Sequence, residues 1–285
     1  MEPASTVDFL RNGLRSTPFG SLILVVCHEA SPRDTLLAEM SFAATSNAGV
    51  SARWISLSEK ASTAEERLQH VRDSQLEMQS DRQAEDEVPS HDLYPAGAPV
   101  FGEARTPEQI AANDETNRRY HAAEKDRERR VLAAKQRIRQ KLMKASAAPT
   151  IASLSRNRVE EAESFVTRWS LDPARPCVFF LDDLLAVQVD GKRGSAKTIG
   201  AVARCLKDIA VSRNVIIVAG APAPMLTAKD RHSLKEFVVA PTPQSLASYG
   251  SPHESADVVV GFKETMNGAL SPVFISNRYA TAPFA

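Results

Sequence analysis

The sequence is poor in the residues that build metal and redox centres. It has only three cysteines among 285 residues, and none lies at a spacing typical of zinc ligands or of a redox pair. Cys27 and Cys177 lie inside apolar runs, which predicts buried, reduced thiols. His28-Glu29 has no second histidine at metal-ligand spacing, and the serines and six histidines form no recognisable nucleophile motif. Zinc sites and nucleophilic catalysis are therefore disfavoured.

Long apolar segments and an excess of either charge are also absent. No run approaches the roughly 20 apolar residues that span a bilayer, and the N-terminus has no basic stretch followed by an apolar one. Lys and Arg total 35 and Asp and Glu total 35, so the net charge is zero. Any surface that binds a polyanion must therefore be local. We expect a cytoplasmic protein, with 43% hydrophobic and 25% charged residues as in ordinary globular proteins.

Two apolar blocks flank a polar middle segment. Within the blocks, strand-like runs alternate with helical patterns, which predicts an α/β fold with a mainly parallel sheet. The expected strands are residues 22–27, 51–57, 177–181, 215–219, 258–262 and 273–276. We therefore divide the chain into a first block at 1–71, an insertion at 72–147 and a second block at 148–285.

The insertion has two parts. Residues 72–104 are rich in Gln, Ser, Asp, Glu, Pro and Gly, which predicts a loop or a disordered segment. Thr106-Pro107 is typical of a helix start, and a charged helix should continue to about Lys144. Between Lys125 and Lys144 the chain carries nine Lys or Arg residues against two Asp or Glu. Two interpretations stay open: a solvated helix with internal charge pairs, or a surface that binds phosphates or a protein partner.

Two predicted strands end at chemically informative residues. Ligand sites in parallel α/β sheets form at the carboxyl ends of the strands. The strand at 22–27 leads into a loop and a helix expected to begin near Thr35, which is where a nucleotide-binding protein carries its phosphate loop. The strand at 177–181 ends in Asp182-Asp183, an arrangement that presents the Mg²⁺-supporting acid of such proteins. Aspartates at strand ends also cap helices, so that alternative stays open.

The first of these strand ends lacks the residues that bind phosphate. A phosphate loop needs glycines, so that backbone N–H groups can close on the phosphates, and a lysine that neutralises them. Arg33-Asp34 stand in place of that Gly-Lys pair, and the Asp34 carboxylate would repel a polyphosphate. The framework is that of an ATPase with altered phosphate-binding chemistry.

Several segments, in a consistent order, resemble the RecA-like motor domain of the bacterial replicative DNA helicases of the DnaB type. The segments are Phe19-Gly20-Ser21-Leu22, Ser56-Leu57-Ser58-Glu59, residues 148–169, Leu181-Asp182-Asp183-Leu184, residues 203–210, residues 248–258 and Ser276-Asn277-Arg278. The resemblance covers most of the chain, and a relative such as a RecA- or KaiC-like protein is also compatible with it. It implies a RecA-like three-layer fold that carries the polar and helical segment as an insertion.

The resemblance also implies roles for residues at the nucleotide. It places Arg33, Asp34 and Thr35 at the phosphates and makes Asp182 the acid that supports Mg²⁺. The position of the catalytic base holds Ser58, with Glu59 shifted by one residue. ATP and Mg²⁺ are therefore the expected cofactors if the site functions.

Further implied roles concern neighbouring molecules. Arg278 would act in trans as an arginine finger on the nucleotide of an adjacent subunit, although a plain surface arginine fits as well. Lys192, Arg193 and Lys197 lie where the family places a loop facing DNA, and a solvated loop fits equally. The partners implied are helicase-like subunits, in a homo- or hetero-oligomer, and single-stranded DNA.

The departures from the family pattern point to lost catalysis. The Gly-Lys pair is replaced, the base position holds Ser58, Ser276 stands in place of a lysine, and Gly220-Ala221-Pro222 follows a strand where the family carries a Ser-Gln sensor. Efficient ATP hydrolysis is therefore not expected.

Three functions follow from these observations. The preferred one is a catalytically degenerate helicase-like accessory in DNA replication or recombination, which contacts single-stranded DNA, an active helicase, or both. The second is an active ATP-dependent helicase that uses Arg33, Thr35, Asp182 and Glu59 in a non-standard way. The third is a scaffold that binds a protein partner and no nucleotide.

Overall fold

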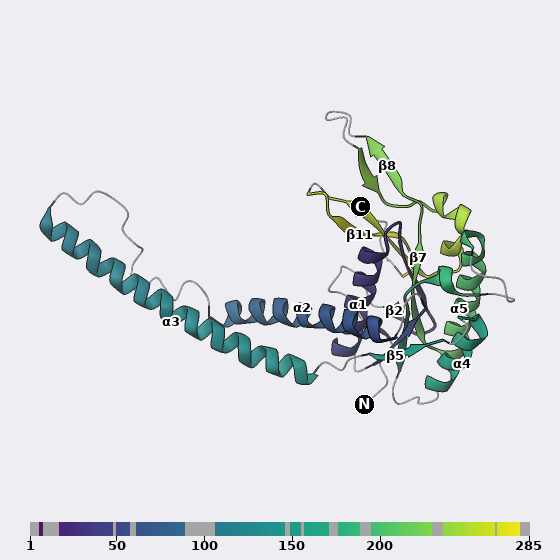
Figure 1. The fold of residues 1–285 in the computed structure, drawn as a ribbon, viewed down its shortest axis with the longest axis horizontal. Helices are drawn as coiled ribbons and strands as arrows, with labels where there is room; N and C mark the ends of the chain where they lie inside the picture. The colour runs from purple at the N-terminus through teal and green to yellow at the C-terminus, as the bar shows by residue number, and fades with distance from the viewer. Residues whose placement is uncertain are drawn as a thin grey trace. The chain divides into compact units, whose positions relative to one another are not determined.

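The computed structural model describes two compact units. They comprise residues 1–72 with 147–285, and residues 73–146. The first unit holds the sheet and the second holds a pair of helices (Figure 1). The described residues are 6–7, 17–47, 50–57, 61–88, 106–145, 149–154, 157–170, 176–188, 195–229, 236–265 and 267–279.

A seven-stranded sheet forms the centre of the first unit. In spatial order its strands are β11 (Leu270–Asn277), β10 (Val258–Glu264), β3 (Leu22–Cys27), β7 (Ile216–Pro222), β6 (Cys177–Leu181), β4 (Ser51–Ser56) and β5 (Thr150–Ser153). Every neighbouring pair is parallel except β10 with β11, which confirms the predicted α/β fold with a mainly parallel sheet. The apolar runs in β3 and β6 are wholly buried because helices cover both faces of the sheet.

The helices form the two outer layers of this unit. On one face, α1 (Ala30–Asn47) and the first turns of α2 (Ala61–Glu87) pack against Ile23 and Val25. On the other face, α4 (Val159–Trp169) and α5 (Ile199–Arg213) pack against Leu22 and Leu24 (Figure 1). This division follows from the alternation of side chains along a strand.

Short elements complete the first unit. Two strand pairs lie outside the main sheet: β1 (Thr6–Val7) with β2 (Thr17–Pro18), and β8 (Leu226–Lys229) with β9 (Glu236–Val239). The 3₁₀ helices are η3 (Leu184–Ala186), η4 (Ala196–Thr198), η5 (Ser245–Tyr249) and η6 (Pro252–Glu254). Among the described residues, no helix is long and apolar enough to cross a membrane.

The second unit consists of the later part of α2 and the long helix α3 (Pro107–Ala145). The prediction of a helix from about residue 107 to 144 is confirmed. The prediction of a loop from residue 72 onward is wrong up to Glu87, because α2 continues to that residue. Ala84 and Val88 pack against Ala134 and Ile138 of α3, and ion pairs flank this contact. Few apolar residues are enough to hold α2 and α3 together because each helix buries its apolar residues against the other.

Candidate functional site

The connection from β3 to α1 is too short to be a phosphate loop. β3 ends at Cys27 and α1 begins at Ala30, so only His28 and Glu29 lie between them. A phosphate loop takes about eight residues. The expected helix start near Thr35 is therefore wrong, because the chain is already helical through residues 30–34. Pro32 fits this first turn because the N–H that it lacks would have no partner within the helix.

Arg33 and Asp34 turn into the protein and are part of a cluster of opposite charges. The Nε atom of Arg33 lies 3.0 Å from Oδ1 of Asp34, and a terminal nitrogen of the same guanidinium lies 3.6 Å from Oδ2 of Asp183. Arg67 of α2 donates to the other oxygen of Asp34 at 2.9 Å. Two arginines and two aspartates thus balance one another, so the cluster offers no excess positive charge to a phosphate.

Asp183 shows how strongly this cluster is shielded from water. Burial raises the pKa of its carboxyl group, and the positive charge of Arg33 only partly opposes that rise. Its carboxylate also accepts a hydrogen bond of 2.9 Å from the backbone N–H of Leu185 and so caps η3. The alternative role of a strand-end aspartate, as a helix cap, is therefore present in Asp183.

Gly220 makes room for the cluster. A Cβ atom at this position would lie 2.3 Å from the carbonyl oxygen of Asp182 and 3.0 Å from Cδ of Arg33. The first distance is far below any normal contact, so only glycine allows β7 to lie this close to the backbone of Asp182. The second distance is tight, so glycine also leaves room for the side chain of Arg33. In the family pattern, a Ser-Gln sensor occupies this position. In this chain, the close packing around residue 220 explains why a glycine is present.

Asp182 is fully buried at the carboxyl end of β6 and binds the neighbouring strand. Its Oδ1 accepts a hydrogen bond of 2.7 Å from the backbone N–H of Leu57, and its Oδ2 accepts one of 3.1 Å from the hydroxyl of Ser56. Both carboxylate oxygens therefore connect β6 to the end of β4.

These residues do not fit MgATP. The short β3–α1 turn offers no ring of backbone N–H groups, the Arg33 guanidinium is paired with aspartates, and the Asp182 carboxylate bonds to protein donors on both oxygens. At the carboxyl edge of β3 and β6, these side chains are thus engaged in ion pairs and hydrogen bonds within the protein.

The remaining predicted site residues are spread over the first unit. Thr35 and Lys197 are exposed, on α1 and η4 respectively, and take no part in the cluster. Glu59, Lys192 and Arg193 lie outside the described residues. Arg67 was not predicted from the sequence as a site residue. Its spacing from Ala64 and Leu68 places it near the core-facing side of α2, but this spacing does not indicate its partner.

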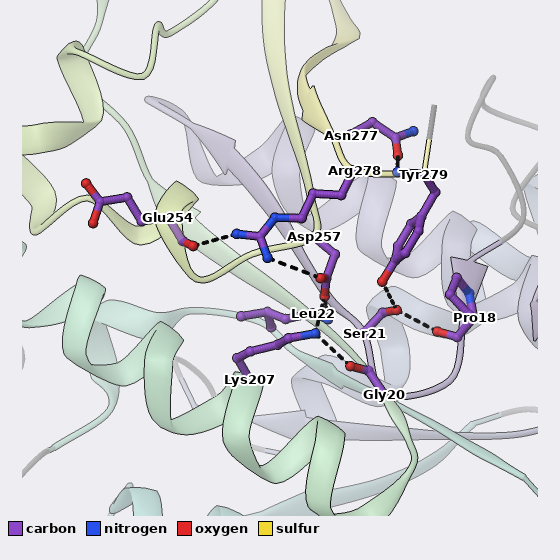
Figure 2. Close-up of polar contacts among 10 residues, drawn as sticks. All are labelled: Pro18, Gly20, Ser21, Leu22, Lys207, Glu254, Asp257, Asn277, Arg278 and Tyr279. Carbon is purple, nitrogen blue, oxygen red and sulfur yellow. Dashed lines mark hydrogen bonds and ion pairs between the residues drawn. The ribbon is translucent and has the colours of Figure 1, made fainter. Parts of the chain in front are cut away.

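Arg278 lies at the opposite edge of the sheet, in a second polar network (Figure 2). A terminal nitrogen of Arg278 donates to the carbonyl oxygen of Glu254 at 2.6 Å, and the other lies 3.7 Å from Oδ1 of Asp257. The ammonium of Lys207 lies 2.7 Å from Oδ2 of Asp257 and also donates to the carbonyl oxygen of Gly20. Asp257 is buried, and the positive charges of Lys207 and Arg278 compensate its carboxylate.

The second network also fixes the start of β3. Asp257 accepts a hydrogen bond of 2.8 Å from the backbone N–H of Leu22, and the hydroxyl groups of Ser21 and Tyr279 lie 2.6 Å apart (Figure 2). Burial raises the pKa of the Tyr279 hydroxyl. Lys207, Asp257 and Arg278 each come from a different segment that carried the family resemblance, and the fold brings the three side chains together.

The sheet order and the helical layers are those of a RecA-like α/β protein. Comparison with solved structures supports this fold. A solved ATPase domain matches with a TM-score of 0.51 and 12% identity, over 91% of this chain and 78% of that one. A DnaB-like replicative helicase, solved for its interactions with primase, matches with a TM-score of 0.52 and 11% identity, over 91% of this chain and 53% of the helicase.

A KaiC-like protein from the hyperthermophilic archaeon Pyrococcus horikoshii OT3 matches with a TM-score of 0.50 and 11% identity, over 99% of this chain and 90% of that one. Identities this low establish the shared fold and nothing finer. No protein-family model matches the chain, and no curated protein matches it.

Proposed function

We propose that this chain is a cytoplasmic, catalytically degenerate RecA-fold protein that acts as an accessory in DNA replication or recombination. It assembles with helicase-like RecA-fold subunits, its own copies or an active helicase, and contacts single-stranded DNA. It does not turn over ATP efficiently.

One observation carries this proposal: the two-residue turn between β3 and α1, with Arg33 and Asp34 buried in ion pairs behind it. Hydrolysis needs phosphates held by backbone N–H groups and a cation, with a metal on an available carboxylate. Here the loop is missing, the cation is committed to Asp34 and Asp183, and Asp182 bonds to β4.

In this proposal, Arg278 and the segment around Lys197 meet the neighbouring molecules. The Arg278 side chain is 54% exposed and has contacts with Glu254 and Asp257 within its own chain. To reach a neighbour's nucleotide it would exchange those contacts for a phosphate. Lys197 is exposed beside residues 190–194, and together they would face a DNA strand.

The test is ATP hydrolysis by the purified full-length chain with Mg²⁺, with and without single-stranded DNA. Alongside it, Arg278→Ala is mixed with an active RecA-fold helicase. We expect no ATP turnover by the chain alone and co-migration of the wild type with the helicase in sedimentation. We also expect the wild type to change the ATP turnover of the helicase, and Arg278→Ala to leave that turnover unchanged. Steady turnover lost in Asp182→Ala would favour the alternative of an active helicase.

The scaffold alternative predicts a different pattern. Deletion of residues 72–145 would then abolish binding of a protein partner and leave DNA binding unchanged. Under the preferred proposal, association with helicase-like subunits is a property of the RecA-like unit and survives this deletion.

A further inference from the structure

The second half of α3 contains no acidic residue. From Arg129 to Ala145 there is no Asp or Glu, although the first half of the helix mixes both charges. Ala134 and Ile138 are buried against α2, which fixes the face of α3 that is turned away from its partner. Because successive residues are about 100° apart around a helix, the exposed residues can be placed on that outer face.

Five cations gather along one flank of α3, between its outer face and the face that contacts α2. Arg129, Arg130, Arg137, Lys141 and Lys144 are all exposed, and they fall within about 120° of one another around the helix. We call them the cationic strip. Arg130 pairs with Asp126 and Arg137 with Glu87 of α2. Among the described residues, Arg129, Lys141 and Lys144 have no ion pair, so three charges remain for a ligand.

A less polar strip runs beside the cationic one. Leu132 is 56% exposed and Met143 is 48% exposed, and Gln136 lies between them on the same side of the helix. The two strips run in parallel from residue 129 to residue 144, a length of about 22 Å at 1.5 Å per residue.

We propose that this face of α3 binds single-stranded nucleic acid, with phosphates on the cationic strip and bases or sugars on Leu132, Gln136 and Met143. The inference rests on the proposed contact with single-stranded DNA and adds a second contact surface, outside the RecA-like unit, to the one proposed around Lys197. A single strand exposes the faces of its bases beside its phosphates, which matches two parallel strips, whereas a duplex exposes only base edges, within its grooves.

Other polyanions fit this face less well. A membrane-binding helix needs a broad apolar face with large side chains, and here the larger apolar stripe is buried against α2. An acidic peptide would gain only weak exposed ion pairs. A nucleic acid gains more from three cations because each phosphate contact releases condensed counterions.

The test is binding of a fluorescent single-stranded oligonucleotide to the full-length chain over a range of salt concentrations. The variant Arg129→Gln, Lys141→Gln, Lys144→Gln removes the three available charges and keeps good helix formers. We expect a loss of roughly 100-fold in affinity at 0.1 M salt and a salt slope smaller by about 2, since each contact to a single strand contributes about 0.7.

Two matched variants provide the controls. Arg118→Gln, Arg119→Gln, Lys125→Gln removes the same charge from the first half of α3 and should change affinity less than about 3-fold, because acidic residues surround those positions. Arg129→Lys, Lys141→Arg, Lys144→Arg keeps the charge and should bind like the wild type. Circular dichroism checks that each variant keeps its helices.

The outcomes separate this inference from the proposed function. In one outcome, the wild type binds DNA, the α3 variant binds equally well, and the triple variant Lys192→Gln, Arg193→Gln, Lys197→Gln loses binding. The α3 inference is then wrong, and the proposed DNA contact stands. Equal losses in the two three-charge variants of α3 would show a bulk charge effect and also overturn it. Binding to phosphatidylserine vesicles in place of the oligonucleotide would overturn the α3 inference and the proposed DNA contact.

Discussion

The two edges of the central sheet use charged residues in different ways. At the carboxyl edge, Arg33, Asp34 and Asp183 pair with one another, and under the proposed function they stand in place of residues that would bind a nucleotide. At the amino edge, Lys207 and Arg278 surround Asp257 at positions that match the helicase-like pattern (Figure 2).

This difference indicates that the segments resembling helicases include residues that stabilise the fold. The matching residues at the amino edge hold α5, the start of β3 and the turn after β11 together, so they have a role in the fold that needs no nucleotide. The departing residues are those that would touch phosphates or metal. Under the proposed function, the chain keeps the architecture of an ATPase without its chemistry, because separate residues carry the two.

The largest expected effect comes from breaking the amino edge. In Asp257→Ala, the backbone N–H of Leu22 and the ammonium of Lys207 both lose their carboxylate, so we expect a loss of about 3 kcal/mol in the free energy of unfolding. Urea denaturation measures it. Asp257→Asn keeps an oxygen for Leu22 and should lose clearly less. A loss below about 1 kcal/mol in Asp257→Ala would mean that this network does not hold the fold.

A smaller effect is expected at the carboxyl edge. Gly220→Ala places a Cβ atom 2.3 Å from a backbone oxygen and 3.0 Å from the side chain of Arg33, so β7 or Arg33 must move. We expect a loss of about 2 kcal/mol by the same denaturation measurement. Arg33→Ala in the same chain should relieve little of this loss, because the shorter contact is with the backbone oxygen of Asp182. No loss in Gly220→Ala would contradict the packing described for the cluster.

The smallest effect is a dependence on pH. Because burial raises the pKa of Asp183 in the folded protein, its protonated form adds stability that is present at low pH and is lost as the pH rises through the raised pKa. We therefore expect the stability of the wild type, relative to Asp183→Asn, to fall as the pH rises above the ordinary pKa range of an aspartate carboxyl. Denaturation at a series of pH values tests this. A relative stability that rises with pH would show that the ion pair with Arg33 outweighs burial.

Much of the sheet could be predicted because its physics is local. Residues 22–27 and 177–181 are unbroken apolar runs, and only a strand covered on both faces accounts for them in so short a length. The charged helix beginning at Pro107 was equally clear from its capping residues.

The errors have physical causes that the sequence does not display. The start of α1 was placed near Thr35 because that position suits a phosphate loop, yet Ala30, Ser31 and Pro32 are all compatible with a first helical turn. The continuation of α2 to Glu87 depends on α3, through Lys135 with Asp81 among other contacts, and its own apolar pattern is weak. The meeting of Lys207, Asp257 and Arg278 depends on the order of the strands, which local patterns do not reveal.

The central claim is that the nucleotide edge is closed by the protein's own side chains, and calorimetric titration of the wild type with ATP and Mg²⁺ tests it most directly. The account predicts no saturable binding at millimolar nucleotide, and none after Arg33→Gly with Asp34→Lys, because the β3–α1 turn remains too short. Saturable binding by the wild type, abolished by Asp182→Ala in a folded protein, would contradict it.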